Sequence, residues 1–167
     1  MSTVLELPLI GPRGEPIDLR RTFSSHGFAD LPPMRADKGA GTLELTLRVP
    51  RGAPRRVRLG PGPTGHLHAE IHGRAVAPRH ADAIRSGLTR VLRLDQDLSG
   101  FYELVREDPD LSWAAAGAGR MLASPTVYED VVKTICTTNC SWSLTTTMVR
   151  ALVTRLGEPT REPEPWS

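Results

Sequence analysis

The chain has 167 residues, of which 24% are charged and 39% hydrophobic, and its formal net charge at pH 7 is +2. This composition is typical of a soluble globular protein, and the length is enough to bury one good core or two small ones. No apolar run approaches the roughly eighteen residues of a membrane span, so we expect no membrane partner. Two cysteines, Cys136 and Cys140, are too few for a disulfide scaffold and fit a reducing cytoplasm.

Positive and negative charges are unevenly distributed along the chain. Residues 1–93 carry 15 Lys and Arg against 8 Asp and Glu, whereas residues 94–167 carry 6 against 11. An Arg-rich first half is compatible with a polyanionic partner. Charge alone favours a plainer interpretation, in which a bias toward Arg, Pro and Gly only places arginines at solvated sheet edges.

The first half of the chain predicts a sheet. Residues 3–10 have the pattern of a first strand, and Asp18 is placed to cap a short helix. Residues 42–49 alternate between apolar and polar side chains, which indicates a strand with one buried face. Two further strands are expected over residues 55–59 and 66–72, and the three together predict an antiparallel meander with one solvated face.

The second half changes to a helical period. A helix is predicted from Pro78 onward, another from Asp97, and an Ala-rich helical stretch over residues 111–121. The side chains of the second of these helices that are expected to pack are Phe101, Leu104 and Val105. Because strands come first and helices later, the sequence predicts the α+β class.

Two amphipathic helices are predicted over residues 124–157. Ser124 is placed as the N-cap of the first, and a wide apolar stripe follows. The chain restarts after Asn139, where Ser141 or Ser143 can cap the second helix, and Gly157 stands where a helix commonly ends. Because both apolar stripes are broad, we expect these helices to belong to a larger helical core.

Two groups of candidate metal ligands have plainer explanations. His66, His68 and His72 share one face of a predicted strand, but no further ligand at a suitable spacing completes a site, so solvent-facing histidines are the better interpretation. Cys136 and Cys140 are four residues apart and are more simply two small buried thiols near a helix end. We therefore expect neither a metal nor a cofactor.

The junction between the last two helices is the most unusual segment. Polar or small residues and one tryptophan separate two strongly apolar helices there. Asn139 carries both donors and an acceptor that can bond base edges, and Trp142 can stack on a base. A capped turn with a half-buried Trp142 explains the same residues, and from the residues alone this second interpretation is preferred.

The run from Ser124 to Asn139, above all its end Ile-Cys-Thr-Thr-Asn, resembles the opening helix of the helix-hairpin-helix DNA glycosylase superfamily. It looks closest to 8-oxoguanine and 3-methyladenine DNA glycosylases, and residues 148–157 are similar to that family's second helix. The organisation that the resemblance implies is a TATA-binding-protein-like antiparallel sheet domain (1–78), connecting helices (79–123), the first two helices of an all-α glycosylase domain (124–157) and a disordered tail (158–167).

The resemblance implies a function in base-excision repair. Such enzymes find a damaged purine in double-stranded DNA, flip it out and hydrolyse its N-glycosidic bond, some with an added lyase activity. The candidate DNA-binding residues are Thr138, Asn139, Ser141 and Trp142. Many 8-oxoguanine enzymes carry an Arg five residues after this Asn, whereas Leu144 stands here, which departs from specificity for an opposite cytosine. The expected location is the cytoplasm, in association with the nucleoid.

The resemblance also implies an absence. The family's Leu-x-Gly-Val-Gly hairpin and its catalytic Asp lie further along, and no such run follows Gly157. We therefore expect a truncated form with no catalytic residue in this chain and no glycosylase activity of the chain alone. A second polypeptide that carries the missing carboxy-terminal half is a candidate partner. The alternative is a non-catalytic remnant that binds DNA or a protein partner.

Overall fold

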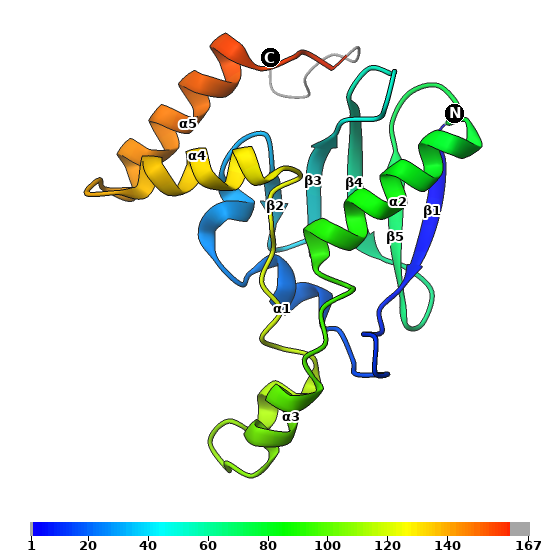
Figure 1. Ribbon diagram of the computed structural model, residues 1–167, viewed down its shortest axis with the longest axis vertical. Coiled ribbons are helices and arrows are strands. Elements are labelled where there is room, and N and C mark those ends of the chain that lie inside the picture. The colour runs from blue at the N-terminus through cyan, green and yellow to red at the C-terminus, as the bar shows by residue number, and fades with distance from the viewer. Residues whose placement is uncertain (1, 161–167) are drawn as a thin grey trace.

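A computed structural model describes residues 2–160 and contains one antiparallel sheet with helices beside it (Figure 1). The strands are β1 (Thr3–Pro8), β2 (Arg35–Asp37), β3 (Thr42–Leu47), β4 (Arg55–Pro61) and β5 (His66–Ile71), in the order β1-β5-β4-β3-β2. The helices are α1 (Leu19–Phe23), α2 (Pro78–Leu92), α3 (Ser99–Arg106), α4 (Val127–Thr137) and α5 (Trp142–Leu156), with 3-10 turns η1 (Gly27–Asp30) and η2 (Ser112–Ala116). The predicted α+β class is confirmed.

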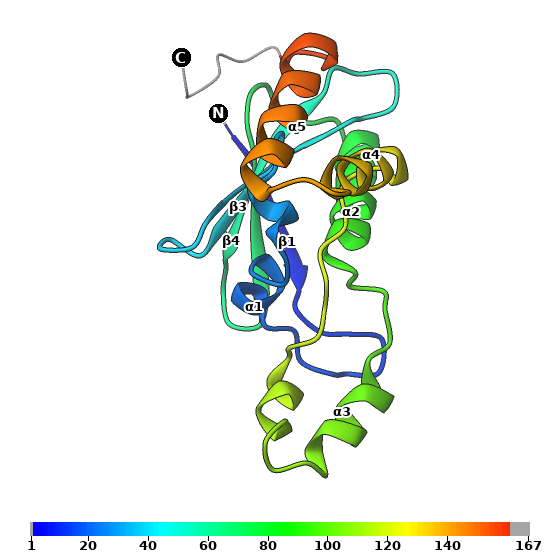
Figure 2. The ribbon, with the colours of Figure 1, turned by 90° about the vertical axis from the view of Figure 1, so that its left-hand side faces the viewer.

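The core lies between one face of the sheet and α2. Strand β3 alternates as predicted, with Leu43 and Leu45 fully buried, and the apolar stripe of α2 presents Ile84 and Leu88 to the same core. Figures 1 and 2 show α2 running across this face. Burying each large aliphatic side chain contributes about 1.5–3 kcal/mol relative to leaving it exposed, so this layer stabilises the frame on which the other elements sit.

The other face of the sheet is solvated and its charges alternate. One row across the strands pairs Glu70 with Arg58, Arg58 with Glu44, and Glu44 with Arg35. Opposite charges directly across a strand pair stabilise the sheet modestly. Strand β2, which contributes Arg35, was not predicted, because three residues with one half-buried side chain give no periodic signal.

The side chains that helix α3 buries differ from those predicted. Phe101 and Leu104 are exposed, and the buried side chains are Tyr102 and Val105. Tyr102 is placed by its hydroxyl, which donates to the carbonyl of Ala118 at 2.8 Å. The expected packing of Leu104 is therefore wrong, because this hydrogen bond and the small Ala-rich partner segment select the Tyr102 face. Phe101 is partly exposed but still packs its ring on Gly119.

Residues 111–121 do not form the predicted helix. A short 3-10 turn ends at Gly117, whose φ of 104° leaves the helical region. A Cβ at Gly117 would lie 2.6 Å from the backbone nitrogen of Asp18, so the close approach of these two segments requires glycine. Asp18 itself caps α1 as predicted, and its carboxylate accepts from the backbone N–H of Arg21 at 3.0 Å.

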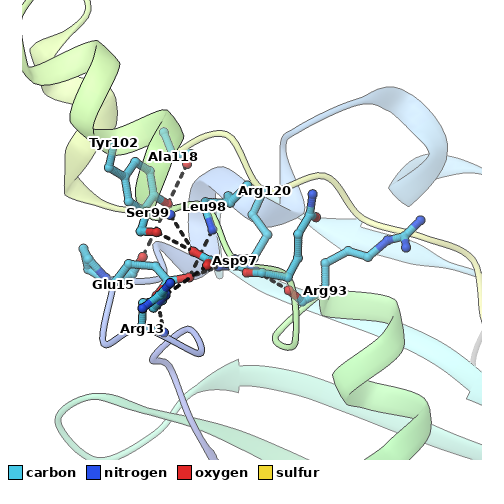
Figure 3. A network of polar contacts seen from close by, with 11 residues as sticks. Arg13, Glu15, Arg93, Asp97, Leu98, Ser99, Tyr102, Ala118 and Arg120 are labelled. Carbon is cyan, nitrogen blue, oxygen red and sulfur yellow. Dashed lines mark hydrogen bonds and ion pairs between the residues drawn. The ribbon is translucent and has the colours of Figure 1, made fainter.

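A buried ion pair joins the segment after η2 to the loop between β1 and α1 (Figure 3). The guanidinium of Arg120 is fully buried, lies 3.5 Å from the carboxylate of Glu15, and donates to the carbonyl oxygens of Arg93 and Gln96. Glu15 also accepts from the backbone N–H of Leu98 at 3.2 Å. Burial would raise the pKa of Glu15, but hydrogen bonds from backbone N–H groups outweigh it and hold that pKa below its ordinary value.

The segment that leads into α4 is hydrogen-bonded both to α2 and to the residue that precedes η1. The N–H of Ala123 donates to Val91 of α2 at 2.9 Å, and the carbonyl of Leu122 bonds Nε2 of His26 at 2.8 Å. Because Nδ1 of His26 accepts from the N–H of Phe28, Nε2 carries the proton in this bond. These contacts fix the point from which the last two helices start.

Helix α2 shares the hydrophobic core of the sheet, although it lies in the segment expected to connect two domains (79–123). The predicted domain boundaries at 78, 123 and 157 themselves stay predictions. Of the expected tail (158–167), only residues 158–160 are described, and the rest lies outside the described residues.

Candidate nucleic-acid interface

Helices α4 and α5 form a helical hairpin with obliquely crossing axes at one side of the molecule, and its turn and the first residue of α5 hold the four residues predicted to contact DNA (Figure 1). Helix α4 ends at Thr137 and α5 begins at Trp142. Asn139 in the turn has a φ of 53°, in the left-handed region that asparagine tolerates better than most residues. Thr138, Asn139 and Ser141 therefore lie in the turn, and Trp142 directly follows them as the first residue of α5.

Asn139 is the most available of the four. Its side chain is exposed, and no hydrogen bond to its amide is found among residues 2–160. A primary amide offers two donors and one acceptor, which is the pattern needed to bond a base edge or a phosphate.

The hydroxyl groups of the turn are already used by the helix ends. Thr138 donates to the carbonyl of Thr134 at 3.2 Å. The Ser141 oxygen accepts from the N–H of Leu144 at 3.3 Å, which confirms Ser141 as the N-cap of α5. Both side chains are exposed, so each retains lone pairs for an outside donor.

Trp142 lies half-buried against the amino-terminal part of the chain. A Cβ built at Gly27 would lie 2.6 Å from Cζ2 of Trp142, so the edge of the indole packs directly on that glycine. The side chain is 47% exposed, which leaves part of the ring open. The geometry thus combines both predicted interpretations, a packed turn and an aromatic surface beside Asn139.

The hairpin is joined to the rest of the molecule at a few buried points. Thr145 on α5 is buried and donates to the carbonyl of Cys136 at 2.9 Å, which binds the two helices together. Lys133 is buried on α4 and Val149 is buried on α5. The remaining large apolar side chains are mostly exposed, for example Val131 at 51% and Ile135 at 64%.

The start of α4 differs from the prediction. Thr126, not Ser124, is the N-cap: its hydroxyl accepts from the N–H of Glu129 at 3.1 Å and donates to the Glu129 carboxylate at 3.2 Å. Thr126 and Glu129 have the residue types and spacing of a capping box, although here the Glu129 carboxylate accepts from the Thr126 hydroxyl and not from its backbone N–H; the third residue after Ser124 is Val127, which cannot take that role. Ser124 instead faces inward, where its hydroxyl accepts from Nζ of Lys133 at 3.1 Å.

Around Ser124 lies a polar cluster that the sequence did not reveal. Its backbone N–H donates to Asp130 at 2.7 Å. Burial lowers the pKa of Lys133, although the nearby charges of Glu129 and Asp130 act in the other direction and raise it. Burial also raises the pKa of Glu129, against the influence of Lys133 and Thr126. A lysine on the apolar side of a helix was the available signal.

The cluster holds α4 in place rather than forming an accessible reaction site. Lys133 is 2% exposed and Ser124 is 0% exposed, so neither can touch a substrate in this conformation. Within residues 2–160 no group of three or more His, Cys, Asp or Glu side chains could hold a metal ion, and no helix there could cross a membrane.

Comparison with known proteins gives a likeness to a solved structure. No protein family model and no curated protein matches the chain. Among solved structures, a 3-methyladenine DNA-glycosylase from Archaeoglobus fulgidus is similar, with a TM-score of 0.68 and 20% identity. The likeness covers 90% of this chain and 50% of that one, so the chain spans about half the length of the structure it matches. At this identity the likeness shows a shared fold.

Proposed function

We propose that this chain acts in DNA base-excision repair as part of a glycosylase of the helix-hairpin-helix type, and that its α4–α5 hairpin contacts duplex DNA at a damaged purine. The observation that carries the proposal is the exposed amide of Asn139, which has no hydrogen-bond partner among the described residues and lies in the hairpin turn of a glycosylase-like fold. The proposed setting is the cytoplasm, in association with the nucleoid.

Asn139 is the residue to which we assign the main contact. An amide carried on a tight turn can enter the space left by a flipped base, where it finds base-edge donors and acceptors that are otherwise paired. Thr138 and Ser141 flank it and offer hydroxyl oxygens to neighbouring phosphates. The open part of the Trp142 ring is available to stack on a base beside the gap.

We assign no catalytic residue to this chain. Cleavage of an N-glycosidic bond needs a placed carboxylate or amine. Glu129 and Asp130 lie in the first turn of α4, whose 11 residues span about 16 Å, and Asn139 follows the other end. The Asp130 carboxylate accepts a hydrogen bond from the backbone N–H of Ser124, and Lys133 is buried. The proposal is that the cleaving group is supplied from outside these 167 residues.

The test is binding by the 167-residue chain to duplexes with and without a single damaged purine, 8-oxoguanine or ethenoadenine. We expect the damaged duplex to bind more tightly, and Asn139→Ala to lower that preference by about tenfold, the discrimination of a good base-edge contact. Thr154→Ala, an exposed change further along α5, serves as the control and should leave the preference intact. Equal affinity of the wild-type chain for both duplexes would refute the proposal, and release of a free base would refute the absence of a catalytic group.

A second candidate function is binding of a protein partner without catalysis. The exposed apolar side chains of the hairpin favour it, including Val127, Val131 and Leu156 at 62%, 51% and 79% exposed. Exposed apolar patches of this kind commonly mark protein interaction sites. DNA binding that depends on Asn139 would favour the first candidate, whereas a stable complex with no affinity for duplex DNA would favour the second.

A further inference from the structure

One end of the sheet gathers arginines from segments that are far apart in the sequence. The β3–β4 loop, the connection from β5 to α2 and the first turn of α2 all lie at this end (Figure 1). They touch one another: a Cβ at Gly52 would lie 3.5 Å from Cε1 of His80, and the N–H of His72 donates to the carbonyl of Arg56 at 3.0 Å. We call this region the basic end and define it by Arg51, Arg74, Arg79 and His80.

The three arginines of the basic end are exposed. No ion pair is found for Arg51, Arg74 or Arg79 among the residues from 2 to 160. The nearby Glu158 is bonded to Arg48. Elsewhere on the sheet, arginines alternate with carboxylates across the strands, so the basic end differs from the rest of this surface by its uncompensated charge.

Two of these arginines occupy positions that local stability does not favour. Arg79 lies in the first turn of α2, which has no acidic residue and no side-chain cap, so its charge faces the positive end of the helix dipole. Arg51 has a φ of 56°, a left-handed conformation that costs most residues other than glycine. Residues whose charge or backbone conformation is locally unfavourable in this way commonly serve a function.

The basic end also lies at a useful distance from the hairpin turn. Helix α5 starts beside Asn139 and is followed by Glu158, which contacts Arg48 next to the β3–β4 loop. Its 15 residues span about 22 Å. At about 3.4 Å per step, this equals six or seven base pairs of duplex DNA. A duplex lying along α5 with Asn139 at the lesion would bring its backbone to the basic end.

We propose that the basic end is a second DNA-binding surface, which holds phosphates of the undamaged duplex beside the lesion without reading sequence. Arginine side chains bind phosphate oxygens through paired N–H groups, and the three arginines come from three separate segments, so they can follow a curved backbone. This inference rests on the proposed function, because it assumes that the hairpin turn meets the same duplex.

The experiment compares two double variants of equal charge change in the full 167-residue chain. R74E/R79E alters the basic end, and R90E/R106E alters two exposed arginines at the far end of α2 and in α3. Affinity for an undamaged and a damaged duplex of about 20 base pairs is measured from about 50 to about 200 mM KCl. The melting temperature of each variant shows whether it is folded, and R79E should not lower it because an acid in the first turn of a helix is favourable.

For R74E/R79E we expect affinity to fall by about tenfold or more for both duplexes, and the damaged-to-undamaged ratio to stay unchanged. The salt slope should decrease by about 0.9 for each phosphate that the variant no longer neutralises. R90E/R106E should have a much smaller effect. Asn139→Ala should do the reverse, lowering the ratio and leaving the slope.

Three results would overturn the inference. Equal reductions of affinity in the two double variants would mean that only net charge matters, and the proposed function would stand. A folded R74E/R79E chain with wild-type affinity and slope would refute the basic end alone. Failure of the wild-type chain to bind any duplex, with binding to vesicles of anionic phospholipid instead, would refute both proposals.

Discussion

The ammonium nitrogen of Lys133 lies 3.1 Å from the hydroxyl oxygen of Ser124, and both side chains are sealed from solvent. A buried ammonium with one hydroxyl acceptor is held at a cost, because desolvation of a charge is repaid only by complete pairing. The contact nevertheless joins α4 to the segment that leads into it. The stability of the hairpin should therefore respond to changes at either residue.

Replacing Lys133 with methionine should leave stability unchanged or raise it. An apolar side chain of similar volume removes the desolvation cost of an ammonium that has no ion-pair partner within 4 Å among residues 2–160, so the free energy of unfolding should not fall. Ser124→Ala in the wild-type background should destabilise by about 1–3 kcal/mol because it removes the acceptor of a buried donor. Urea unfolding of wild type, K133M, S124A and the double variant measures whether the two residues are coupled. If Ser124→Ala destabilises the K133M chain as much as it destabilises wild type, the two residues are not coupled.

The same lysine should make stability depend on pH. Its pKa is lowered in the folded protein from an ordinary value of 10.5, so the unfolded chain binds more protons between the two values. Stability should therefore rise with pH across that window and be lowest below the folded pKa. The difference in unfolding free energy between wild type and K133M, measured from neutral pH to about pH 10.5, should shrink as pH rises. A constant difference would show that Lys133 does not titrate there.

Gly27→Ala should destabilise the hairpin. The added Cβ would lie 2.6 Å from the indole of Trp142, which forces the ring away at a cost of about 1–3 kcal/mol. Trp142→Leu should relieve part of this destabilisation, which thermal melts of the single and double variants measure. Gly100→Ala is the matched control, because its Cβ meets nothing within 4 Å and alanine favours a helix by about 0.5–1 kcal/mol. Equal effects at both glycines would contradict the packing of the indole on Gly27.

Arg120→Leu should be among the most destabilising single changes in the molecule. It leaves the buried Glu15 carboxylate without its cation, and breaking one side of a buried pair costs about 3–5 kcal/mol. Arg13→Ala is the control, since the Arg13 ion pair with Asp97 is exposed and exposed pairs contribute about 0–1 kcal/mol. Chemical denaturation distinguishes them, and a destabilisation at Arg120 no larger than at Arg13 would show that the buried pair is unimportant.

Asn139→Gly should separate fold from function. Glycine adopts the φ of 53° freely, so the change should keep or slightly raise stability, by up to about 1 kcal/mol. It removes the amide, so preference for a damaged duplex should fall as it does for Asn139→Ala. Thermal melts and duplex binding of the same sample provide both readouts, and a folded variant with intact preference would place recognition elsewhere.

Much of the fold follows from local patterns. The alternation of residues 42–49 predicts β3 because each second side chain must reach the core, and the period of α2 predicts its buried stripe. The caps at Asp18 and Ser141 were predicted because a side-chain oxygen before an amphipathic run satisfies free N–H groups. These signals act over a few residues, which is why they are readable in the sequence.

The features that were missed depend on contacts between distant segments. The face of α3 is set by a hydrogen bond from Tyr102 to Ala118, and the pairing of Arg120 with Glu15 joins residues with no shared period. The candidate DNA-binding residues were predicted to lie together because they are close in the sequence, at positions 138, 139, 141 and 142. The packing of Trp142 on Gly27 had no local signal.

Few side chains of the α4–α5 hairpin are buried against the rest of the molecule, and this affects how fast its backbone amide protons exchange with solvent deuterium. Helices α4 and α5 are joined to the frame mainly through Lys133, Trp142 and Val149, whereas β3, β4 and β5 share a continuous apolar layer. Opening free energies within a native protein follow such differences in burial. The two helices should therefore open together as one cooperative unit while the sheet stays closed, so the chain can release and re-form its proposed recognition turn without global unfolding.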